Sequence, residues 1–103
     1  MALEFTILGE DGAPKHVAPV AVDAHWEIVE AAERHRLRRI GGCREYHEDH
    51  VIRRSFLSEF RHELGVLRAR AGLSPVAVRC LEQLEALTHI AQAERHVILA
   101  LAD

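Results

Sequence analysis

The chain has 103 residues, of which 49% are hydrophobic and 28% are charged. This length and composition are typical of one globular domain with its own core, and they exclude a disordered chain. The formal net charge of −3 argues against nucleic-acid binding, because proteins that bind nucleic acids use a basic face to displace counterions from phosphates. We therefore expect a single domain over residues 1–103, with no nucleic-acid partner.

The N-terminal segment and the two cysteines indicate a cytoplasmic protein. Residues 1–12 contain acidic Glu4 and no long apolar run, so they predict neither a secretory signal nor a membrane span. Cys43 and Cys80 are far apart in the sequence and form no metal-binding pair, which is usual for thiols that remain reduced in the cytosol. We expect a cytoplasmic location and no membrane partner.

The chain opens with a pattern typical of a strand. Residues 3–8, LEFTIL, alternate between apolar and polar side chains, which predicts a strand with one buried face. Asp11-Gly12 follows and favours a tight turn, since both residues tolerate positive φ. Residues 16–22 are predicted as a second extended segment. Because Pro19 has no N–H to donate, this segment is either an edge strand or a loop.

The first helix is predicted over residues 24–39. Asp23 is a suitable N-cap, and the Gly41-Gly42 pair marks a backbone that turns freely after the helix. The residues expected on its apolar stripe are Ala24, Ile28, Ala31, Ala32 and His35, broadened by Trp26 and Val29.

Two further helices are predicted in the second half of the chain. The second covers residues 55–70, with Ser55 as its N-cap and a left-handed Gly72 after its end. Ser74-Pro75 then starts a third helix that runs to about Glu94, because a capping hydroxyl is followed by proline at the first helical position. The inward positions expected on this helix are Ala77, Leu81, Leu84, Thr88 and Ala91.

The last segment completes the predicted fold. Residues 97–102 form an apolar run that is too short for a membrane and is typical of a buried strand. We expect an α+β domain in which a small sheet, built from the N-terminal and C-terminal strands, packs against three helices.

Residues 44–50, REYHEDH, are the main candidate for a functional site. Glu45, Glu48 and Asp49 flank Tyr46, the only tyrosine in the chain. Tyrosine offers a large contact with a polar tip and is enriched in binding hot spots. Carboxylates beside it attract a cationic protein and accept paired hydrogen bonds from arginine. This pattern predicts a partner-binding surface, although Arg44, Arg53 and Arg54 place positive charge at its edges and leave a solvated mixed-charge surface as the alternative.

A metal site is a second hypothesis for the same stretch. His47 and His50 are three residues apart, which on a helix places both rings on one face. Zinc needs three or four ligands, and Cys43, His62 and the nearby carboxylates are not fixed as the missing ones. The HExxH pattern fails at both His47 and His62, because no second histidine lies four positions on. A metal-binding protein or metal-dependent hydrolase using His47 and His50 therefore remains the alternative, and no cofactor is expected otherwise.

Other catalytic patterns are weak. Ser55, Ser58 and Ser74 are explained by helix capping, and no GxSxG nucleophile motif or glycine-rich phosphate loop occurs. Cys43 follows a flexible glycine pair and is a weak candidate for a reactive thiol. We expect that the protein is not an enzyme.

Three stretches carry a resemblance to a known group of proteins. Residues 3–12, LEFTILGEDG, residues 45–50, EYHEDH, and residues 97–103, VILALAD, occur in an order that resembles small bacterial α/β proteins. Those proteins open with a similar strand and turn, carry a Tyr-Tyr-Glu-Asp-like motif and finish on a strand that ends in Ala-Asp. They look like immunity proteins of polymorphic toxin loci.

The resemblance implies a cognate protein toxin as the partner, neutralised when the immunity protein blocks its active site. The motif falls on Tyr46, His47, Glu48 and Asp49, with His47 in place of the second aromatic residue. Asp103 matches the last residue of the group and would add negative charge to the partner-binding surface. A homodimer is a further possibility that the sequence leaves open.

Overall fold

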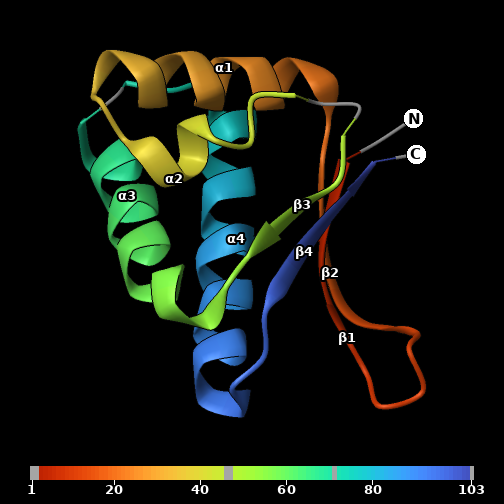
Figure 1. The fold of residues 1–103 in the computed structure, drawn as a ribbon. Coiled ribbons are helices and arrows are strands. Elements are labelled where there is room, and N and C mark those ends of the chain that lie inside the picture. Colours follow the sequence, from red (N-terminus) through yellow and green to blue (C-terminus); the bar gives the residue numbers. More distant parts are fainter. Residues whose placement is uncertain (1–2, 46–47, 71, 103) are drawn as a thin grey trace.

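The computed structural model describes residues 3–45, 48–70 and 72–102, and these form an α+β fold (Figure 1). Its elements in chain order are β1 (Leu3–Leu8), β2 (Pro14–Val20), α1 (Val22–Arg34), α2 (Arg38–Gly41), β3 (His50–Ile52), a 3₁₀ turn (Arg54–Phe56), α3 (Leu57–Arg70), α4 (Pro75–Glu94) and β4 (Ile98–Ala102). None of the helices in these ranges is long and apolar enough to cross a membrane.

The described residues form a four-stranded antiparallel sheet with the order β2-β1-β4-β3. The predicted pairing of the first and last strands is confirmed, with Leu3 opposite Ala102 and Thr6 opposite Leu99. The segment with Pro19 is indeed an edge strand, β2. Strand β3 was not predicted, because its three residues are too few to show an alternating pattern.

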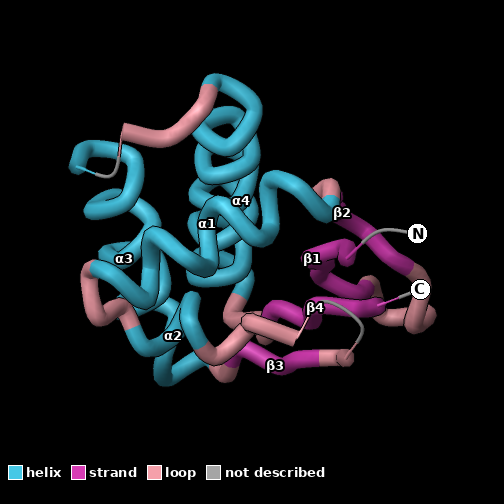
Figure 2. The backbone as a smooth tube through the Cα atoms, turned by 90° about the horizontal axis from the view of Figure 1, so that it is seen from above, coloured by secondary structure: helices cyan, strands magenta, loops and turns pink. Residues whose placement is uncertain are grey.

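Helices α1–α4 all lie on one side of the sheet, and the core fills the space between the two layers (Figure 2). All five inward positions expected on α4 are buried. On the sheet side, Leu3, Phe5 and Ile7 are buried as their alternation predicts, and the Phe5 ring stacks 6.4 Å from that of Phe60 on α3.

The predicted helix over residues 24–39 is wrong at its C-terminal end, because the helix is interrupted at residues 35–37. Arg36 has a φ of 57°, and the Leu37 N–H donates to the Ala32 carbonyl oxygen at 2.8 Å. This six-to-one bond closes a Schellman motif, which is usually formed with glycine in the left-handed position. Because arginine occupies that position here, the sequence has no glycine that would predict the end of α1.

The predicted helix starts differ in accuracy. Ser74 caps α4, as expected, and accepts a hydrogen bond from the Ala77 N–H at 3.3 Å. Asp23 lies in the first turn of α1 rather than at its N-cap. Ser55 is not the cap of α3 either, because it is taken up in the 3₁₀ turn and α3 begins at Leu57.

Candidate functional site

The predicted partner-binding residues lie mainly on the segment 43–49, here called the acidic loop, which connects α2 to β3 (Figure 1). Glu45, Glu48 and Asp49 are exposed on it. The other two predicted residues, Tyr46 and Asp103, lie outside the described residues. The acidic loop thus presents three carboxylates at the end of the molecule where α2 meets the edge of the sheet.

A buried histidine holds the first part of the acidic loop. His25 of α1 is 3% exposed, and its Nε2 lies 2.9 Å from the Arg44 carbonyl oxygen. Because a carbonyl can only accept, Nε2 carries the proton and donates it to this bond. Burial lowers the pKa of His25, the hydrogen bond to Arg44 opposes this change, and the charge of His50 lowers the pKa further. A neutral imidazole therefore anchors the loop backbone.

The arginines that flank the acidic loop make their contacts elsewhere. The Arg44 guanidinium forms an ion pair with Glu33 of α1 and lies 5.5 Å from the ring centroid of Trp26. Arg54 donates to the Arg95 carbonyl oxygen at 3.2 Å, at the C-terminal end of α4. Within the described part of the chain, neither Glu45 nor Glu48 has a side-chain ion pair or hydrogen bond. Their carboxylates are therefore not neutralised by the flanking arginines.

The second part of the acidic loop is tied to the sheet. His50 Nε2 lies 2.8 Å from the Glu45 carbonyl oxygen, and Asp49 Oδ1 accepts a hydrogen bond from the Ala102 N–H of β4 at 2.8 Å. Asp49 therefore combines an exposed carboxylate with a structural role. The loop is fixed at both ends, which reduces the conformational entropy that binding of a partner would remove.

Glu63 of α3 caps the short helix α2, which precedes the acidic loop. Its side chain is buried, and its two oxygens accept hydrogen bonds from the N–H groups of Arg39 at 3.2 Å and Ile40 at 3.0 Å. These groups belong to the first turn of α2, where helical N–H donors have no partner within the helix. This role of Glu63 was not predicted from the sequence. An acid on the apolar stripe of α3, between Phe60 and Leu67, was the signal that was available.

The metal and thiol hypotheses gain no support from the described residues. His50 already bonds a backbone carbonyl through Nε2, and His47 lies outside the described residues. Within residues 3–45, 48–70 and 72–102, no group of three or more His, Cys, Asp and Glu is placed to hold a metal ion. Burial, together with the charge of Glu63, raises the pKa of Cys43 to about 11. A thiol with this pKa is protonated and unreactive at neutral pH.

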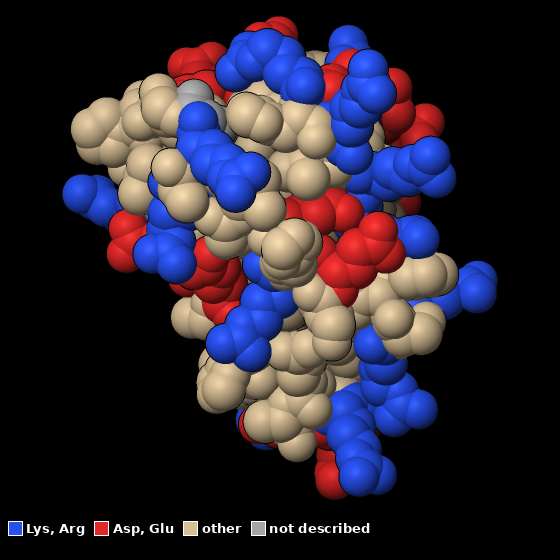
Figure 3. Space-filling model, turned by 90° about the vertical axis from the view of Figure 1, so that its left-hand side faces the viewer, with Lys and Arg blue, Asp and Glu red and all other residues tan. Residues whose placement is uncertain are grey.

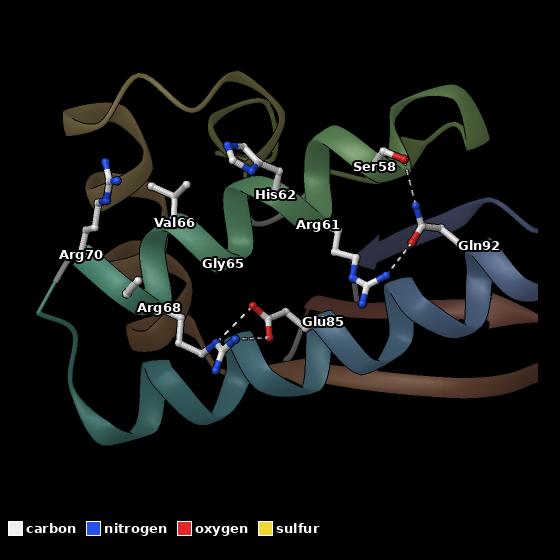
Figure 4. A pocket seen from close by; sticks show the side chains of 10 residues that line it. Ser58, Arg61, His62, Gly65, Val66, Arg68, Arg70, Glu85 and Gln92 are labelled. Atoms are coloured by element: carbon white, nitrogen blue, oxygen red, sulfur yellow. Dashed lines mark hydrogen bonds and ion pairs between the residues drawn. The ribbon is translucent and has the colours of Figure 1, made fainter.

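A second surface feature is the groove of about 630 Å³ between α3 and α4. Arginines and carboxylates are interspersed on the α3 side of the molecule (Figure 3). Inside the groove, Arg68 pairs with Glu85 at 3.2 Å and Arg61 donates to Gln92 at 3.2 Å (Figure 4). Two of its arginines are thus already engaged within the molecule, in contrast to the carboxylates of Glu45 and Glu48.

No protein family, curated protein or solved structure matches this chain. The resemblance to immunity proteins therefore stays a prediction.

Proposed function

We propose that this protein is a non-catalytic binding module of the bacterial cytoplasm, and that it is an immunity protein which blocks the active site of a cognate toxin. The observation that supports this function is that the carboxylates of Glu45 and Glu48 are exposed and have no side-chain partner among the described residues. Both are exposed on an anchored loop, while Arg44 and Arg54 make their contacts with other parts of the molecule.

The acidic loop suits a cationic partner. Exposed carboxylates of one sign accelerate association with an oppositely charged protein and accept bidentate hydrogen bonds from arginine. A toxin that acts on an anionic substrate carries positive charge in its active site, and the loop carboxylates would occupy the place of that substrate. Tyr46, between them in the sequence, would supply the apolar contact area at the centre.

The test uses the protein encoded by the neighbouring gene as the candidate toxin. Co-expression with this chain should restore the growth of cells that produce the candidate toxin, and titration calorimetry should give a stable complex. The double variant Glu45→Lys/Glu48→Lys should weaken binding by about 30-fold or more, because charges at the centre of an interface contribute more than those at its rim.

A matched control keeps the net charge change but moves it away from the loop. Glu10→Lys/Glu82→Lys alters the β1–β2 turn and α4, and Figure 1 shows this turn at the end of the molecule opposite the acidic loop. This control should bind within about threefold of the wild type. Asp49→Asn, which keeps the Oδ1 acceptor for Ala102, measures the charge of Asp49 separately. Equal affinities for the loop variant and the control would refute the proposed site, and absence of any complex would refute the immunity function.

A further inference from the structure

The two edges of the sheet differ in how they are protected. Edge strand β2 contains Pro14 and Pro19, which have no N–H and so discourage a further strand. Edge strand β3 contains no proline. A surface groove of about 340 Å³ runs along β3, and residues of α2 line its other side. Strand β3 is therefore the edge at which another strand can be added.

The outer face of the sheet carries a row of three apolar side chains and the buried Thr6, and this row ends at the β3 edge. No helix of the described part of the chain covers this face (Figure 2). Val17, Thr6, Leu99 and Val51 lie opposite one another on β2, β1, β4 and β3. Val51, at the end of the row, is 59% exposed. An exposed valine on an edge strand without proline leaves that edge open to a further strand.

The charged residues on either side of Val51 are arranged so that the segment is complementary to a second copy of itself. Two acids, Glu48 and Asp49, precede β3, and two bases, Arg53 and Arg54, follow it. When this segment is paired antiparallel with a copy of itself about Val51, Asp49 of one chain lies opposite Arg53 of the other, while Arg54 already begins the 3₁₀ turn. Opposite charges that face each other across two strands stabilise the pair, and like charges destabilise it.

We propose that two copies of this chain form a symmetric dimer by antiparallel pairing of β3 with β3. In this arrangement Val51 meets its own copy on the two-fold axis, Asp49 faces Arg53, and the outer row of side chains continues from one sheet into the other. The same patch serves both partners, as a two-fold interface requires. Arg53 is exposed, and the Oδ2 atom of Asp49 is not used by the Ala102 contact.

The dimer has two further properties. Because β3 is only three residues long, the contact is small and the dimer dissociates at low concentration. The dimer also uses Asp49 of the acidic loop, so a cationic partner of this loop competes with the second copy. The inference does not depend on the proposed function, since it is measured on the chain alone.

Sedimentation equilibrium of the purified full chain, over a wide range of concentration, tests the dimer directly. The wild type should show a reversible monomer–dimer equilibrium. Val51→Lys should raise the dissociation constant about tenfold or more, because lysine on an edge strand opposes pairing. Val76→Lys on α4 is the matched control, since Val76 is 61% exposed, and it should leave the equilibrium unchanged. A wild type that is monomeric at every concentration, or equal effects of the two variants, would overturn the proposal.

A charge exchange tests the register. Arg53→Glu and Asp49→Arg each place like charges opposite one another, so each variant alone should be monomeric. An equimolar mixture of the two variants restores opposite charges at both contacts and should form a heterodimer. If the mixture stays monomeric while the wild type dimerises, this register is wrong.

A cross-link tests the two-fold axis. Directly opposite residues of an antiparallel pair have Cβ atoms about 4.5–5.5 Å apart, close enough for a disulfide after small adjustment. Val51→Cys should therefore give a covalent dimer with a mild oxidant, while Val76→Cys should not. The native Cys43 and Cys80 are buried and do not interfere. Equal cross-linking of the two variants would contradict the pairing.

Discussion

Replacement of Glu63 by alanine removes the cap of α2, the helix that precedes the acidic loop. The carboxylate accepts two backbone hydrogen bonds from α2, at 3.2 and 3.0 Å, and a bond to a charged group contributes about 1.5–3 kcal/mol. Water can replace part of the bond to Arg39, which is less buried than Ile40. Glu63→Ala should therefore lower the free energy of unfolding by about 2–4 kcal/mol. Glu63→Gln keeps one acceptor oxygen and should lower the free energy of unfolding by about half as much.

Urea unfolding followed by circular dichroism measures this effect, and the slope with denaturant should not change. Glu59→Ala is the matched control on the same helix. Glu59 pairs with Arg39 at 3.0 Å, but the two side chains are 47% and 37% exposed. Exposed pairs contribute little, so this variant should lose at most about 0.5 kcal/mol. A loss below about 1 kcal/mol for Glu63→Ala, or losses of equal size for the two variants, would refute the assigned role of Glu63.

Three other residues give separate predictions. Gly65→Ala should raise the free energy of unfolding by about 0.5–1 kcal/mol, since the added Cβ would lie 3.9 Å from Glu85 Oε1, and a decrease in a melting experiment would contradict this. Because the pKa of His25 is lowered from 6.5 on folding, the unfolded chain binds its proton at higher pH. The stability that a neutral His25 contributes is thus complete above about pH 6.5 and is lost as the pH falls towards the lowered pKa. The free energy of unfolding of the wild type should therefore decrease more than that of His25→Gln between about pH 7.5 and 5.5. Equal losses would show that His25 is not the group responsible. Cys43, with its pKa raised to about 11, should react with iodoacetamide at neutral pH only in the unfolded protein, as mass spectrometry of native and denatured samples would reveal, and rapid labelling of the native protein would contradict its burial.

The elements that the sequence predicts are those with a local cause. The α4 helix begins at Ser74-Pro75, where capping and the proline act within one turn, and its inward positions follow the helical period. The alternation in β1 likewise identifies a strand, although Thr6, which was expected on the open face, is buried as well. In each case neighbours in the sequence determine the structure.

The elements that were missed depend on contacts between distant residues. Strand β3 is a strand because β4 lies beside it, and its three residues carry no period. The end of α1 depends on Arg36 in a left-handed conformation, which favours no particular residue except glycine and asparagine. The acidic character of the loop was visible in the sequence. The pairing of Arg44 with Glu33 was not, because it depends on how α1 packs against the loop.

The most direct test of the acidic loop is the ionic-strength dependence of the association rate with the toxin, measured by stopped-flow fluorescence. We predict fast association of the wild type that slows steeply as salt is added, and a slow, nearly salt-independent rate for Glu45→Lys/Glu48→Lys. An association rate of the wild type that does not respond to salt, or a loop variant that retains the same salt dependence, would contradict the claim that these carboxylates attract the partner.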